Sequence, residues 1–210
     1  MPSILSLTRA GLSTIAVAAI GQQLGVHIGA SFSTLNFFSY FTNLSNLFAA
    51  SVLLLSVFKP PSNLSGSTDL ARFVSAVNMV VVGLVFAVLL RNIDLGSLLP
   101  WVNIVLHYII PVAIVLDWSV NPPVTRLNAK HLLLALVFPA IYFGYVLLRG
   151  TNTGWYPYPF LNPANVGGYG GVATYSLGIA VTFVLAGWAL LTVGNRLASP
   201  QQPSVVSVVV

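Results

Sequence analysis

Residues 98–118 read LLPWVNIVLHYIIPVAIVLDW, and this stretch decides the class of the protein. An α-helix needs about 20 predominantly apolar residues to cross the roughly 30 Å hydrocarbon core of a membrane. The stretch is long enough and apolar enough to do so. His107 lies at its middle, where an ionisable side chain is costly in lipid. The stretch therefore predicts a transmembrane helix and marks His107 as a candidate functional residue.

The whole chain has the composition of a polytopic membrane protein. Of its 210 residues, 57% are hydrophobic and 5% are charged, and the mean hydropathy is +0.91. A soluble domain carries charged side chains on roughly a quarter or more of its surface, which eight basic and three acidic residues cannot supply. The net charge of +5 therefore indicates membrane orientation and not nucleic-acid binding. Because the chain has no cysteine, disulfides, thiolate metal sites and thiol nucleophiles are excluded.

Six segments predict an all-α bundle of six transmembrane helices. They cover residues 5–26, 33–58, 71–91, 98–118, 131–148 and 169–193. Clusters of Pro, Gly, Asn and Asp, as in 59–63 and 121–123, separate them. One transmembrane domain is predicted over 1–197, followed by a C-terminal tail, 198–210, that is too short to span and is expected to be disordered. The first segment has no clear signal-peptidase site, so we expect it to be retained.

The basic residues predict that both termini are cytoplasmic. With six spans the termini share one side, and that side collects Arg9, Lys59, Arg72, Arg126, Lys130 and Arg196, against Arg91 and Arg149 on the other. The positive-inside rule then places both termini in the cytoplasm, and a bacterial plasma membrane is the expected location. We further expect Asp117 to face Arg126 or Lys130, and Arg91 to pair with Asp94.

The second span carries an unusual polar face. Asn36, Ser39, Asn43 and Asn46 advance by three, four and three residues, which keeps them on one side of a helix, and Thr42 borders them. A polar face of this kind should point into the helix bundle and not toward lipid. The predicted topology puts Thr42 roughly 14 Å below the outer surface at about 1.5 Å per residue, the same depth as His107.

On the fourth span, Asn103 and Pro111 lie one turn on either side of His107. Proline has no amide hydrogen, so Pro111 leaves the carbonyl of His107 without its usual donor and opens the helix to a water or a side chain. The alternative is a proline that only kinks the helix to fit its neighbours.

Thr42 and His107 together suggest a hydroxyl nucleophile activated by a histidine base. A threonine hydroxyl is a poor nucleophile at neutral pH unless a neighbour takes its proton, and histidine has a pKa suited to that exchange. Ser39, Asn43, Asn46 and Asn103 are the supporting polar pocket, as candidates to orient the imidazole or to donate to an oxyanion. No carboxylate is expected at that depth, so the pair would act as a dyad. The alternative is a non-catalytic protein that binds or transports a lipid or small molecule in the same pocket.

The positions of the ionisable residues exclude several other classes of membrane protein. A retinal protein needs a mid-membrane lysine, and Lys59 and Lys130 both lie at span ends. A zinc or bis-histidine haem site needs several ligands at one depth, where only His107 qualifies. We therefore predict no metal and no cofactor. A proton-coupled transporter would usually carry a mid-membrane carboxylate, which is not expected here.

Three motifs carry a resemblance to a known family. They are YFTNLSN at 40–46, HYIIP at 107–111 with DW at 117–118, and WYPYPF at 155–160. With these motifs, residues 5–197 resemble the bacterial six-helix membrane proteins that are named for rhodopsin-like character. That group is in turn distantly similar to the androgen-induced integral membrane hydrolases of animals.

The resemblance implies an intramembrane threonine hydrolase that acts on lipid esters, such as fatty acid esters of hydroxy fatty acids. The nucleophilic threonine of the family falls on Thr42, and its essential histidine, followed four residues on by proline, falls on His107. The sequence departs from the animal enzymes at Asn43 and Asn46. Membrane lipids are the partners this implies. The outer connection, residues 150–168, would be either a lid over a lipid entrance or an aromatic plug that seals the helix ends.

Overall fold

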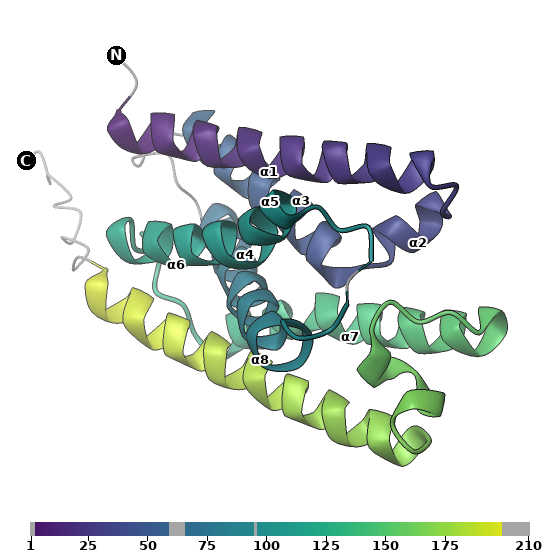
Figure 1. The fold of residues 1–210 in the computed structure, drawn as a ribbon. Coiled ribbons are helices and arrows are strands. Elements are labelled where there is room, and N and C mark those ends of the chain that lie inside the picture. Colours follow the sequence, from purple (N-terminus) through teal and green to yellow (C-terminus); the bar gives the residue numbers. More distant parts are fainter. Residues whose placement is uncertain (1–2, 59–65, 95, 199–210) are drawn as a thin grey trace, which may run out of the picture.

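The computed structural model describes residues 3–58, 66–94 and 96–198, and it confirms the predicted bundle of membrane-spanning helices (Figure 1). Within these residues, six helices are long and apolar enough to cross a membrane. The predicted tail lies outside them apart from its first residue. The helices are α1 (Ile4–Gly29), the short α2 (Thr34–Phe38), α3 (Phe41–Phe58), α4 (Gly66–Val85), α5 (Pro100–Ile104), α6 (Ile110–Val120), α7 (Ala129–Thr153) and α8 (Tyr169–Leu197).

Two of the spans contain a turn of π-helix. The turn Phe86–Leu90 continues α4, and the turn Val105–Ile109 joins α5 to α6. The connection between α7 and α8 holds two short 3₁₀ turns, Pro159–Leu161 and Pro163–Asn165. π-Helical turns are rare and are often found at functional sites.

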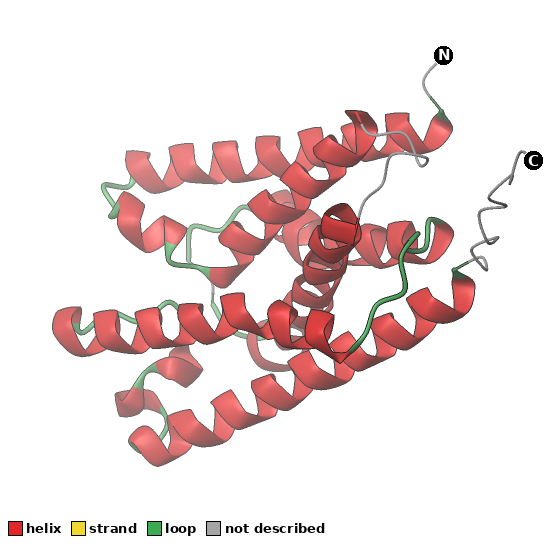
Figure 2. Ribbon diagram, turned by 180° about the vertical axis from the view of Figure 1, so that it is seen from behind, coloured by secondary structure: helices red, strands yellow, loops and turns green. Residues whose placement is uncertain are grey.

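The first and last helices fix the two ends of the bundle. Ile4, where α1 begins, and Leu197, where α8 ends, lie at the same end (Figure 1), as an even number of spans requires. We call this the terminal end and the other the distal end. The rear view shows that the described residues are helical apart from turns and loops (Figure 2). The α7–α8 connection lies at the distal end.

The second span is broken, which corrects the prediction of one helix over 33–58. The chain leaves α2 at Ser39 and Tyr40 and restarts as α3. Ser39 Oγ bonds to the carbonyl of Leu35 at 2.7 Å, and Tyr142 donates its hydroxyl to the carbonyl of Ser39 at 2.8 Å. Such side-chain bonds offer the backbone an alternative to helical pairing. The break leaves Asn36 on α2, while Thr42, Asn43 and Asn46 lie on α3.

Helix α4 is the centre of the bundle and contacts α3, α6, α7 and α8. In the most apolar stretch of α3 and of α4, 56% of the residues are buried, against 17% in α7. A Cβ atom added to Gly83 would lie 3.3 Å from Pro111 Cβ. This close approach of α4 to α6 helps hold the segment that carries His107 against the core.

A buried ion-pair network ties three helices together near the terminal end. Asp117 on α6 accepts from Arg9 Nε on α1 at 2.6 Å and from Arg72 on α4 at 3.1 Å. The expectation that Asp117 faces Arg126 or Lys130 was therefore wrong. It failed because Arg9 and Arg72 were assigned to the membrane surface, whereas both are buried inside the bundle.

The expected pair of Arg91 and Asp94 is also not formed. Asp94 Oδ1 accepts from the backbone N–H of Gly96 at 2.8 Å, and no ion pair joins it to Arg91, both residues being described. The carboxylate caps a turn between α4 and α5 instead.

Replacing Asp117 by Asn should destabilise the protein by about 3–5 kcal/mol, because two buried guanidinium groups lose their shared carboxylate. Thermal unfolding in detergent micelles measures the loss. The control is Asp94→Asn, which removes an exposed carboxylate but keeps an oxygen for Gly96, and should change stability by less than about 0.5 kcal/mol. Equal melting temperatures for the two variants would contradict a structural role for the network.

Replacing Gly171 by Ala should weaken the packing of the α7–α8 connection against the start of α8. A Cβ there would lie 1.8 Å from the carbonyl oxygen of Val166, so the backbone must shift, at a cost of roughly 1–3 kcal/mol. Gly178→Ala is the matched control, because nothing lies within 4 Å of its added Cβ. It should cost nothing and can add up to about 1 kcal/mol of helix stability. Proteolysis of the connection and thermal unfolding would both register the difference.

Candidate functional site

The break in the second span creates a helix start inside the membrane domain. The first N–H groups of a helix have no partner within it. Here the N–H of Phe41 donates to the hydroxyl of Tyr142 at 3.2 Å, and the N–H of Thr42 donates to the hydroxyl of Tyr158 at 3.3 Å. Tyr142 lies on α7 and Tyr158 lies in the α7–α8 connection. Two tyrosines from distant parts of the chain therefore accept hydrogen bonds from the first two N–H groups of α3.

The π-helical turn beside Pro111 leaves a backbone carbonyl without a hydrogen-bond donor in its own helix. The N–H of Ile110 bonds to the carbonyl of Val105. The carbonyl of Leu106 then has no helical donor, because the next residue is Pro111, which has no N–H. Asn46 Nδ2 donates to Leu106 O at 3.2 Å and also to Thr42 O at 2.9 Å. The prediction that Pro111 opens the helix to a side chain holds, with the bond made at Leu106 and not at His107.

His107 and Thr42 come together at the junction of these two irregular segments. Thr42 Oγ1 lies 3.4 Å from His107 Nε2, and both residues are buried. His107 Nδ1 lies 3.2 Å from the carbonyl oxygen of Asn103. A carbonyl can only accept, so Nδ1 carries the hydrogen of the neutral ring and Nε2 presents a lone pair. That lone pair faces the threonine hydroxyl.

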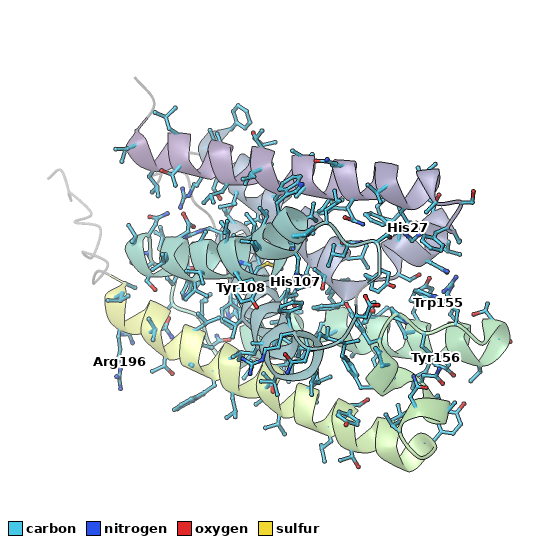
Figure 3. The ribbon with its side chains drawn as sticks, viewed as in Figure 1. His27, His107, Tyr108, Trp155, Tyr156 and Arg196 are labelled. Atoms are coloured by element: carbon cyan, nitrogen blue, oxygen red, sulfur yellow. The ribbon has the colours of Figure 1, made fainter. Side chains whose placement is uncertain are left out.

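An aromatic contact on the face of the imidazole ring also restricts its orientation. Phe86, in the π-helical turn at the end of α4, stacks on His107 with ring centroids 4.0 Å apart and an interplanar angle of 23°. An aromatic stack and a backbone hydrogen bond together restrict the ring to one orientation. Figure 3 places His107 inside the bundle, with Trp155 and Tyr156 toward the distal end and Arg196 at the terminal end.

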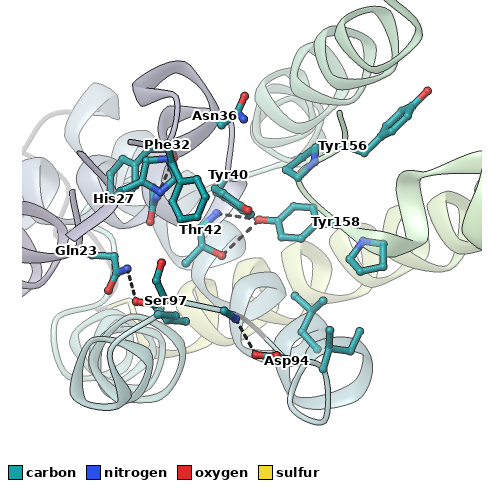
Figure 4. Close-up of a pocket in the computed structure, with 18 of the residues that line it drawn as sticks. Gln23, His27, Phe32, Asn36, Tyr40, Thr42, Asp94, Ser97, Tyr156 and Tyr158 are labelled. Atoms are coloured by element: carbon teal, nitrogen blue, oxygen red, sulfur yellow. Dashed lines mark hydrogen bonds between the residues drawn. The ribbon is translucent and has the colours of Figure 1, made fainter. Parts of the chain in front are cut away.

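A cavity of about 460 Å³, lined by both polar and apolar side chains, leads from this pair toward the distal end, and we call it the vestibule. Thr42 and His107 both line it. Figure 4 shows Thr42 beside Tyr158 among the lining residues. The other lining residues come from the end of α1, from α2 and α3, from the two π-helical turns, and from the α4–α5 and α7–α8 connections. Its polar lining includes Gln23, His27, Asn36, Tyr40, Asn43, Asp94, Ser97, Tyr158, Asn162 and Asn165.

The predicted supporting residues divide into two groups. Asn43 lines the vestibule, and its Nδ2 donates to the carbonyl of Phe37. Ser39, Asn46 and Asn103 do not line it. Ser39 and Asn46 hold the backbone at the two irregular segments, and Asn103 contributes its main-chain carbonyl to His107 while its side-chain oxygen has no partner.

Sequence reasoning missed the tyrosine and phenylalanine at the site. Tyr158 Oη lies 3.5 Å from Thr42 Oγ1 and accepts from the N–H of the same residue. Burial raises the pKa of the Tyr158 hydroxyl above its ordinary value, so it stays protonated at neutral pH and can donate. The WYPYPF motif pointed to this connection but not to this hydroxyl. Nothing in the sequence pattern distinguishes Phe86 from other apolar residues of α4.

The α7–α8 connection is a wall of the site. It begins at residue 154 and not at 150 as predicted, because α7 continues to Thr153. Arg149, near the end of α7, donates to Asn36 Oδ1 at 2.6 Å and lies over the ring of Trp155. Tyr158 reaches inward from it to Thr42. The connection therefore closes one side of the vestibule and supplies a group to the site, beyond sealing the helix ends as a plug would.

Comparison with known proteins gives one result. The sequence model of the family described as FAR-17a/AIG1-like protein matches residues 14–192, which is most of the chain and includes Thr42, His107 and Tyr158. No curated protein and no solved structure matches the chain. The match agrees with the resemblance to the androgen-induced membrane proteins and with the multi-pass architecture. The chain belongs to the FAR-17a/AIG1-like family.

Proposed function

We propose that the protein is an intramembrane hydrolase of lipid esters, with Thr42 as the nucleophile and His107 as the general base. The observation that carries this proposal is the bond between His107 Nδ1 and Asn103 O, which leaves Nε2 free to accept the proton of Thr42 Oγ1, 3.4 Å away. Contact distances at a catalytic pair are often long before substrate binds. Family membership supports the same assignment, since the resemblance implies these two residues.

The reaction would run in two balanced steps. Thr42 Oγ1 attacks the ester carbonyl while His107 Nε2 takes its proton, and the tetrahedral intermediate expels the alcohol, which leaves with that proton from His107. An acyl group is then bound to Thr42. Water entering from the vestibule loses a proton to His107 and attacks the acyl carbon. The fatty acid leaves, and the proton returns to Thr42 Oγ1.

Tyr158 would stabilise the oxyanion. Its oxygen already accepts from the N–H of Thr42, so its own hydrogen is available to a substrate carbonyl beside Thr42 Oγ1. Tyr142 cannot take this role in the same way, because its hydroxyl donates to the carbonyl of Ser39. Preorganised donors of this kind are often the largest single contribution to acyl-transfer catalysis.

The setting of this activity is a lipid bilayer. We propose that the protein resides in a bacterial plasma membrane with cytoplasmic termini, so that the vestibule opens on the outer side. A lipid-binding protein without turnover would use the same residues, and it is distinguished by the first experiment below.

Replacing Thr42 by Val, which keeps the side-chain shape and removes the hydroxyl, should reduce hydrolysis of a fatty acid ester of a hydroxy fatty acid by roughly 10³-fold or more. A fluorophosphonate probe should label the wild type and not this variant. The control is Thr182→Val on α8, which removes a hydroxyl that bonds only to the carbonyl of Gly178 and should leave rate and labelling unchanged.

Equal labelling of wild type and Thr42→Val would show that the nucleophile is another residue. A wild-type protein that retains the ester through purification, and returns it intact after long incubation, would favour the binding function.

Replacing Tyr158 by Phe should lower kcat by roughly 10²-fold or more and change KM little, because the lost donor acts mainly in the transition state. Tyr175→Phe is the matched control, since its ring stacks on Phe160 but it lines neither cavity of the site region. Thermal unfolding checks that both variants are folded. A change confined to KM would mean that Tyr158 only contacts bound substrate.

A further inference from the structure

A second cavity, of about 570 Å³, lies between α4, α7 and α8. We call it the chamber. In contrast to the vestibule, it is lined almost wholly by apolar side chains. They include Val81, Val85, Leu136, Phe143, Phe160, Leu161, Ala173, Ala180 and Phe183.

The chamber and the vestibule meet at the proposed reacting residues. Thr42 and Tyr158 line both cavities, and Leu90 is the third residue that they share. Phe41 packs against Phe138 and Phe183 beside this junction. A molecule seated at Thr42 can therefore extend into a polar space on one side and an apolar space on the other.

The chamber reaches the surface of the bundle that faces lipid. Leu177 and Val184 line it and are 67% and 43% exposed, although both lie within the span α8. Its lining on α8 runs from Ala173 to Val184, a rise of roughly 16 Å at 1.5 Å per residue. This is about half of the roughly 30 Å hydrocarbon core, and so about the length of one lipid tail in one leaflet.

We infer that the chamber is the binding site for the acyl chain of the substrate, and that the alcohol part of the ester occupies the vestibule. The inference rests on the proposed function for the position of the ester at Thr42. One unbranched acyl chain would enter from the membrane between α7 and α8, with its carbonyl at the junction. The substrate class is thus an ester of one long acyl chain with an alcohol polar enough to face the vestibule lining.

Photo-crosslinking tests the site independently of turnover. The probe is a long-chain fatty acid with a diazirine near its methyl end, applied to Thr42→Val in micelles and in vesicles, and crosslinks are mapped by peptide mass spectrometry. We expect adducts on chamber residues such as Leu136, Phe143, Ala180 and Phe183. Adducts only on lipid-facing residues outside the chamber would overturn the inference.

A chamber-filling variant tests the same site through specificity. Ala180→Phe places an aromatic ring where several methylene groups would lie, and should reduce crosslinking by about tenfold or more. In the otherwise wild-type enzyme it should shift the preferred substrate to shorter acyl chains. Ala189→Phe is the matched control, because Ala189 is exposed on the same helix and lines neither cavity.

The outcomes separate the two proposals. Hydrolysis that depends on Thr42, together with unchanged chain-length preference and crosslinking in Ala180→Phe, would overturn the acyl-chain site and leave the proposed function standing. Crosslinking in the chamber that Ala180→Phe abolishes, in a protein without esterase activity, would overturn the proposed function and leave an acyl-chain binding site.

Discussion

Backbone groups inside a membrane domain must find partners within the protein, and the site of this protein is built on two places where a helix fails to provide them. One is the break at Ser39 and Tyr40, and the other is the π-helical turn before Pro111. Non-helical backbone at such depth is tolerated only where it is buried in protein or lines a cavity. Both irregular segments meet these conditions, because tyrosine hydroxyls and Asn46 complete their pairing.

The same contacts that satisfy the backbone also position the residues of the proposed site. Asn46 bonds to the carbonyls of Thr42 and Leu106, so one amide links the helix of the threonine to the helix of the histidine. Tyr158 bonds to the N–H of Thr42 and brings its own hydroxyl to the threonine oxygen. The network of Arg9, Arg72 and Asp117 holds α1, α4 and α6 near the terminal end, away from the vestibule. Structural and proposed catalytic roles are thus divided between the two ends of the bundle.

The arrangement of polar and apolar space suits an amphiphilic substrate. The vestibule opens at the distal end, and the chamber opens to lipid between the two least buried of the later helices. Thr42 and Tyr158 lie where they meet. A lipid ester has the same division, with an apolar tail and a polar alcohol on the two sides of its carbonyl. On the proposed function, this geometry explains why Thr42 and His107 lie within the membrane domain and not at its surface.

From the sequence we could predict the fold class, five of the six spans as continuous segments, and the common depth of Thr42 and His107. These features follow from hydropathy and helical rise, and both depend only on the order of residues along the chain. Proline at position 111 also predicted an opened carbonyl near His107. The catalytic roles of the two residues stay a proposal.

Packing between distant segments sets the break in the second span, the partners of Asp117 and the position of Tyr158. Each of these depends on side chains more than 40 residues away in sequence, and no local pattern encodes which distant group arrives. The break needs the tyrosines of α7 and of the following connection to satisfy the N–H groups it exposes. The sequence thus determined which residues are buried at one depth, and packing between helices determined which of their polar atoms meet.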